Sequence, residues 1–110
     1  MALPHAQPLE VIDICPLGPA LHDTATTSLL KTPRLQLMRL VLSAGSGTPE
    51  HSVPGAITVH CLEGTAVVTT ASRRCELHPG QLVMLPENEH HAVQALTDSS
   101  LLVTLLLHQT

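Results

Sequence analysis

Histidine is the residue type that offers this 110-residue sequence the most chemistry, because eight of its residues are histidines. Two of them, His51 and His91, stand close to apolar segments with the composition of buried strands. Imidazole is the commonest metal ligand in proteins, and it also donates and accepts hydrogen bonds near neutral pH. The pattern therefore indicates either a metal site or a polar contact inside a ligand pocket.

Other reactive side chains lack the context that catalysis requires. The three cysteines, Cys15, Cys61 and Cys75, are odd in number and form no C-x-x-C pair, so we expect free thiols in a reducing compartment. Glu50 and Glu89 each precede a histidine, but both fall in segments typical of loops. No serine lies in a nucleophile elbow, and no glycine-rich phosphate loop is present.

The composition excludes several classes of partner. Five Lys and Arg against nine Asp and Glu give a net charge of −4, which argues against nucleic acid and anionic membranes. There is no Phe, Tyr or Trp, so no aromatic platform can stack a base, a sugar ring or a flavin. Only 13% of residues are charged, which predicts a buried subunit interface and hence a homodimer. The first eight residues show no signal-peptide pattern, so we expect a cytoplasmic protein.

Short strands are expected along the whole chain, because apolar and β-branched runs alternate with Gly, Pro, Asn and Ser clusters. A turn at Glu63 and Gly64 predicts a hairpin between two of these strands. This spacing is typical of a single-domain, all-β barrel, in which residues 1–33 pack against a barrel formed by residues 34–110. The expected strands are residues 9–15, 28–31, 35–42, 57–63, 65–71, 75–78, 82–85, 91–96 and 101–107.

Two motifs follow one another in this pattern. In GSGTPEHSVPGAITVHCLEG, five residues separate Gly45 from His51, and six separate Ile57 from Gly64. In PGQLVMLPENEHHAV, five residues separate Gly80 from Pro86, and four more lead to His91. The two motifs, in this order, resemble those of the cupin superfamily over about residues 34–107. The resemblance implies a double-stranded β-helix, the cupin-type jelly-roll barrel, and it agrees with a homodimer.

The same resemblance implies a metal site that this chain retains only in part. Metal-binding cupins hold one divalent cation with a first-motif His, a second His two residues on, a Glu or Gln four residues later, and a second-motif His. Here His51 and His91 match the first and last positions, but Val53 and Ile57 occupy the other two. Hydrocarbon side chains have no lone pair for a metal, so half of the ligand set is missing.

A neighbouring residue would have to complete the set. If Ile57 points into the barrel, Val59 and Cys61 share its face, whereas His60 lies on the other face. His51, His91 and Cys61 would then offer two nitrogens and a sulfur, and a bulge would bring in His60 instead. The alternative is that Cys61 is a small buried hydrophobe.

Three functions therefore remain open. The first is a binding or regulatory module whose aliphatic pocket, lined by Val53, Ile57, Val59 and Cys61, takes a small molecule that His51 and His91 hydrogen-bond. The second is an enzyme of the dioxygenase or isomerase type, with one divalent transition metal (Zn, Fe, Ni, Mn or Cu) on His51 and His91. The third is a purely structural role in dimerisation.

Overall fold

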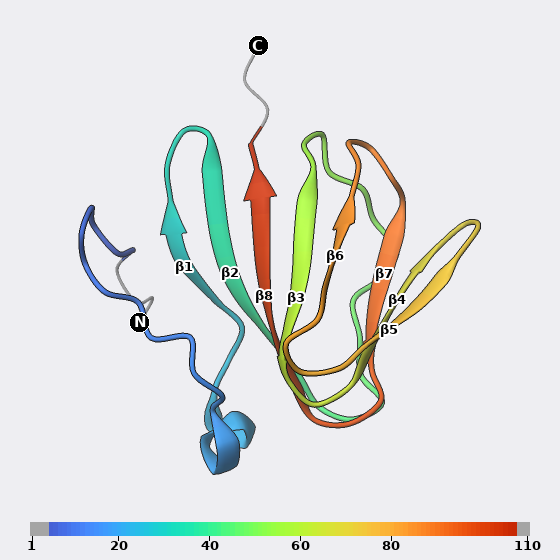
Figure 1. Ribbon diagram of the computed structural model, residues 1–110, viewed down its shortest axis with the longest axis horizontal. Helices are drawn as coiled ribbons and strands as arrows, with labels where there is room; N and C mark the ends of the chain where they lie inside the picture. The colour runs from blue at the N-terminus through green and yellow to red at the C-terminus, as the bar shows by residue number, and fades with distance from the viewer. Residues whose placement is uncertain (1–4, 108–110) are drawn as a thin grey trace.

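Two antiparallel β-sheets face each other in the computed structural model, which describes residues 5–107 (Figure 1). The sequence-based prediction of an all-β jelly-roll barrel is confirmed. The five-stranded sheet has the order β1 (Thr27–Lys31), β2 (Leu35–Leu42), β8 (Ser99–Leu106), β3 (Ile57–Glu63) and β6 (Leu82–Leu85). The three-stranded sheet has the order β5 (Arg74–Leu77), β4 (Ala66–Thr70) and β7 (His91–Ala95).

The core lies between the two sheets and consists almost entirely of aliphatic side chains. Strand β3 shows why: Ile57, Val59 and Cys61 alternate with more polar residues, and all three are buried on the inner face. Leu101 on the neighbouring strand β8 is fully buried and pairs with Cys61 across the ladder. The period-two pattern thus fixes which face of the sheet builds the barrel interior.

The predicted hairpin at Glu63 and Gly64 is wrong, because the connection leads from one sheet to the other. Strand β3 pairs with β6 and β8, whereas β4 pairs with β5 and β7. Gly64 makes this crossing with a φ of +80°, and a Cβ on it would stand 2.2 Å from the carbonyl oxygen of Asp98. A tight sheet-to-sheet turn and a tight hairpin have the same glycine signal in sequence.

The strand predicted at residues 9–15 is also wrong. The segment is irregular, and Leu9 and Val11 are fully exposed instead of packing on the barrel. An alternating sequence forms a strand only when a neighbouring edge accepts its backbone hydrogen bonds, and these residues meet no such edge among residues 5–107.

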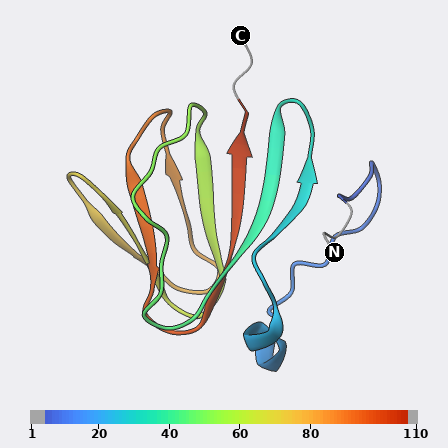
Figure 2. The same cartoon turned by 180° about the vertical axis from the view of Figure 1, so that it is seen from behind.

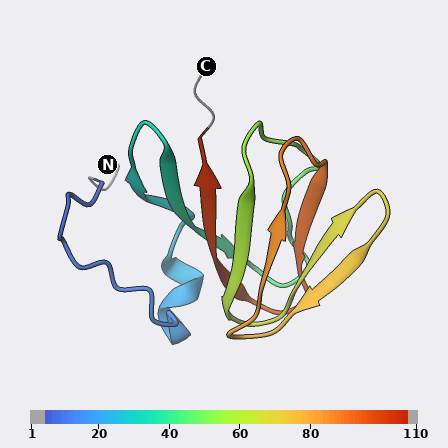
Figure 3. The ribbon, with the colours of Figure 1, turned by 45° about the horizontal axis from the view of Figure 1, so that its top comes forward.

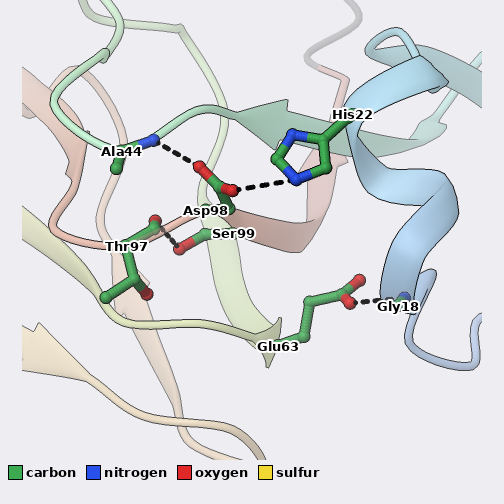
Figure 4. A network of polar contacts seen from close by, with 7 residues as sticks. All are labelled: Gly18, His22, Ala44, Glu63, Thr97, Asp98 and Ser99. Atoms are coloured by element: carbon green, nitrogen blue, oxygen red, sulfur yellow. Dashed lines mark hydrogen bonds and ion pairs between the residues drawn. The ribbon is translucent and has the colours of Figure 1, made fainter.

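Polar contacts tie the rest of the N-terminal region to the barrel (Figure 4). The 3-10 helix η1 (Gly18–Asp23) begins where the Glu63 carboxylate accepts hydrogen bonds from the amides of Leu17 and Gly18, at 2.8 and 3.0 Å. His22 lies 3.4 Å from the Asp98 carboxylate, whose other oxygen accepts a hydrogen bond from the Ala44 amide. Strand β1 then pairs with β2 at the edge of the larger sheet.

Residues 1–4 and 108–110, which belong to the two predicted regions 1–33 and 34–110, lie outside the described residues. Within the described part of the chain, no helix is long and apolar enough to cross a membrane.

Candidate functional site

His51 and His91 lie directly side by side, although 39 residues separate them in the sequence. His91 opens β7, and His51 belongs to the segment between β2 and β3, which runs along β7 (Figure 2). The two residues exchange both backbone hydrogen bonds, each with an N–O distance of 2.9 Å. This bridge brings the two imidazole rings together, with 4.4 Å between their centroids.

Each ring is held in the same way by a carbonyl two residues earlier in the chain. The Nδ1 atom of His51 lies 3.0 Å from the carbonyl oxygen of Pro49, and that of His91 lies 3.0 Å from the carbonyl oxygen of Glu89. Because a carbonyl oxygen only accepts, Nδ1 of each ring carries the proton. In the neutral tautomer that this contact selects, Nε2 has a lone pair, which accepts a hydrogen bond or binds a metal ion.

A cavity of about 200 Å³ opens beside the two rings, inside the barrel. His91 is only 3% exposed, whereas His51 lies at the solvent-exposed rim. Aliphatic residues from both sheets form most of the wall, and the complete lining is Met38, Leu40, Thr48, His51, Val53, Ile57, Val59, His91, Val93, Val103 and Leu105.

Five of the six pocket residues considered from sequence line this cavity; Cys61 does not. The remaining wall comes mainly from β2 and β8, where Met38 pairs with Val103 in the ladder. Alternation along both strands, applied to the inner face, would have found these two residues. Thr48 lies outside the strands and accepts a hydrogen bond from the Val93 amide at 3.1 Å, a contact with no local sequence signal.

Neither predicted third ligand joins the histidine pair. The thiol of Cys61 is buried beyond the cavity and donates to the carbonyl oxygens of Glu63 and Gly64, at 3.5 and 3.3 Å. Burial raises the pKa of this thiol above its usual range, so the sulfur keeps its proton. His60 lies on the opposite face of β3, between Leu82 and Leu102.

The side chains around the cavity therefore supply only part of the ligand set that metal-binding cupins use. Val53 and Ile57 both face the cavity at the positions where the missing ligands would stand. Across residues 5–107, no cluster of three His, Cys, Asp or Glu side chains is placed to hold a metal ion. Two imidazole nitrogens remain, which is fewer than the three protein ligands usual for a catalytic transition metal.

The comparison with known families agrees with the barrel and with the two motifs. The family model described as "cupin domain" matches residues 38–107, about two thirds of the chain. This chain is a cupin. No curated protein matches its sequence.

Solved structures show how widely this fold is shared. A cupin superfamily protein from Desulfitobacterium hafniense is 23% identical, with a TM-score of 0.73 and 76% of each chain covered. A conserved protein of unknown function from Streptococcus pyogenes is 19% identical, with a TM-score of 0.76, covering 100% of this chain and 97% of that one. KdgF from Halomonas sp. is 19% identical, with a TM-score of 0.68, covering 76% and 80%. Identities this low show the shared fold alone.

Proposed function

We propose that this cupin is a binding module for a small, mainly aliphatic molecule that carries one hydroxyl or carboxyl group. The observation that carries the proposal is the cavity itself, whose aliphatic wall is interrupted by two imidazole rings and one threonine. Concave, mostly apolar sites with a few placed polar atoms are the usual form of a small-molecule pocket.

The volume and the chemistry of the wall limit the ligand. An apolar cavity of roughly 150 Å³ holds benzene, so about 200 Å³ suits a ligand of roughly seven or eight non-hydrogen atoms. With no aromatic residue in the sequence, recognition rests on shape and on the polar group. A ligand hydroxyl would donate to Nε2 of His91 or His51, and a carboxylic acid would share its proton with the same atoms.

Calorimetric titration with hexanol, cyclohexanol and hexanoate as probes tests this function. We expect binding of one probe molecule per chain, lost in Val53→Phe, whose larger side chain fills the cavity, and weakened at least tenfold in His91→Ala. His78→Ala is the matched control, because His78 is an exposed turn residue. If none of the probes binds, or if Val53→Phe binds them as well as the unaltered protein, the pocket is not a ligand site.

A metal-dependent enzyme of the dioxygenase or isomerase type is the second candidate, and one observation favours it. Metal-binding histidines usually donate their other ring N–H to a backbone carbonyl or a carboxylate, as His51 and His91 both do. The incomplete donor set weighs against this candidate, since water or substrate would have to supply the remaining ligands of the Zn, Fe, Ni, Mn or Cu ion.

Elemental mass spectrometry on tag-free protein separates the two candidates. One equivalent of metal, lost in His51→Ala and in His91→Ala but kept in His78→Ala, would favour the enzyme. Sub-stoichiometric metal that both substitutions leave unchanged would favour the metal-free pocket. The cytoplasmic location stays a prediction; Cys15, Cys61 and Cys75 are free thiols in the structure.

A further inference from the structure

A second cavity, of about 290 Å³, lies inside the barrel and is separate from the one beside the two histidines. On the β3–β6 ladder, Val59 pairs with Val83; Val59 lines the first cavity, whereas Val83 lines the second. The neighbouring inner pair, Ile57 and Leu85, is divided between the cavities in the same way. No described residue lines both cavities, so they are two distinct spaces over one sheet.

The second cavity lies where the edges of the two sheets separate. Within the described chain, β5 pairs only with β4 and β6 pairs only with β3, so no ladder joins β5 to β6. The β4–β5 hairpin projects away from β6 (Figures 1 and 3). Val68 and Thr70 of β4 and Cys75 of β5 line the cavity on this side. Ser72 and Arg73 line it too and are exposed, so the cavity reaches the surface at the hairpin turn.

The interior of this cavity is aliphatic, and its charged groups lie nearer the surface. Val68 and Leu85 are buried, and Val83 is half-buried. Arg73 is exposed in the turn between β4 and β5, and Glu89 is half-buried in the segment between β6 and β7. A small molecule in the cavity would therefore meet hydrocarbon inside, and one cation and one anion nearer the entrance.

The fold uses the backbone of Arg73 and Glu89 but not their charges. The Arg73 amide donates to the hydroxyl of Thr70 at 3.2 Å, and its carbonyl oxygen accepts from the Thr70 amide at 2.8 Å. The Glu89 carbonyl oxygen holds Nδ1 of His91 at 3.0 Å. The ion pairs among residues 5–107 involve neither side chain, and the two do not pair with each other. Both charges are thus held in position and available to a ligand.

We propose that this second cavity binds an aliphatic α-amino acid. The Arg73 guanidinium donates to its carboxylate, its ammonium group donates to the Glu89 carboxylate, and its side chain packs in the aliphatic interior. A zwitterion fits because a ligand with a single charge would leave one of the two protein charges unpaired. An apolar cavity of roughly 150 Å³ holds benzene, so about 290 Å³ suits roughly ten or eleven non-hydrogen atoms, which is enough for leucine.

Titration of the ¹⁵N-labelled protein with L-leucine, followed by NMR, tests this site. At millimolar leucine we expect the largest changes in the amide signals of residues 70–75 and 83–89, with the signals of Leu40 and Val103 in the first cavity unchanged. Two analogues test the need for both charges: 4-methylpentanoate lacks the ammonium group, and 3-methylbutylamine lacks the carboxylate. Each should bind at least tenfold more weakly than leucine.

Substitutions test the two charges of the protein. Arg73→Gln and Glu89→Gln should each weaken leucine binding at least tenfold, because each removes one charge-assisted contact. Arg74→Gln and Glu87→Gln are the matched controls, since both residues are exposed, carry the same charges and do not line the cavity. These controls should bind leucine as the unaltered protein does.

Two cavity-filling variants separate this site from the first cavity. Val83→Phe should abolish leucine binding, whereas Val53→Phe should leave it unchanged, because Val53 lines only the first cavity. The NMR spectrum of each variant shows whether it is folded. The proposal is overturned if leucine leaves residues 70–75 and 83–89 unchanged, or if either analogue binds as well as leucine. It is also overturned if Arg73→Gln or Glu89→Gln retains the affinity of the unaltered protein.

Discussion

Replacement of Glu63 by glutamine should detach the N-terminal region from the barrel and lower its stability. The carboxylate of Glu63 accepts hydrogen bonds from the amides of Leu17 and Gly18 and from the hydroxyl of Ser100. Glutamine keeps the length of the side chain, but it turns one acceptor oxygen into a donor NH₂ group. At least one of these three donors must then lose its partner, and the Ser100 side chain is fully buried.

The size of the effect follows from the type of bond. A hydrogen bond to a charged group contributes roughly 1.5–3 kcal/mol, although the half-exposed position of Glu63 lets water replace part of the loss. We therefore expect Glu63→Gln to lower the free energy of unfolding by about 2 kcal/mol at pH 7. For a domain of this length, that corresponds to a fall in Tm of about 8 °C.

The pH dependence separates the charge from the shape of the side chain. Burial raises the pKa of the Glu63 carboxyl, but hydrogen bonds from Leu17, Ser100 and Gly18, together with the Arg39 guanidinium, outweigh this and lower it overall. The folded-state pKa thus lies below the unfolded-state value of about 4.3. The stability contributed by the charge is complete above that value and is lost as the pH falls through the folded-state pKa.

Thermal unfolding followed by circular dichroism between pH 7 and pH 3 measures both effects. The Tm difference between the unaltered protein and Glu63→Gln should be largest at pH 7 and should shrink as Glu63 becomes protonated. Glu76→Gln is the matched control, because Glu76 is an exposed glutamate on β5. A difference that is absent at pH 7, or equal at pH 7 and pH 3, would refute the assignment of an anchoring role to the carboxylate.

Two further substitutions test the barrel itself. Gly64→Ala should lower the free energy of unfolding by more than about 3 kcal/mol, because the new Cβ would overlap the Asp98 carbonyl oxygen and because a φ of +80° is unfavourable for alanine. Urea unfolding measures this change, and an unchanged midpoint would contradict the prediction. Leu101→Ala should lower the free energy of unfolding by about 2–5 kcal/mol in the same assay, because Leu101 is fully buried between the sheets. A decrease of less than about 1 kcal/mol would mean that the surrounding side chains close the gap left by the leucine.

Most of the fold could be predicted from sequence because each strand carries its own signal. The alternation in β3 gives the buried face of the strand, with Ile57, Val59 and Cys61 inside. Asn88 has a φ of +64°, the left-handed conformation that asparagine tolerates better than most residues, so its turn is also a local feature of the sequence. Local patterns of this kind are decided within a few residues, so a single sequence contains them.

What could not be predicted depends on which strand meets which. The run Leu9 to Cys15 is rich in β-branched residues and partly alternates, yet it stays irregular because no edge among residues 5–107 receives it. The turn at Gly64 joins two sheets where a hairpin would look the same in sequence. The position of Cys61 could not be predicted for a similar reason. Alternation shows that its side chain points into the barrel, but not how far along the barrel axis it lies from the cavity.

The histidine pair combines a structural and a functional role in one geometry. The backbone bridge between His51 and His91, with the two ring contacts to Pro49 and Glu89, holds the segment before β3 against β7. These contacts use only the backbone and Nδ1 of each histidine. These contacts are sufficient for a structural role, which does not require Nε2 of either ring to lie beside an aliphatic cavity.

Substitution of either histidine by asparagine separates the two roles. The side-chain NH₂ of asparagine can still donate to the carbonyl oxygen, so the structural role is kept, whereas the acceptor at Nε2 is lost. His51→Asn and His91→Asn proteins that fold normally but no longer bind the probe would therefore assign ligand recognition to Nε2, whereas retained binding would leave the pair a structural device.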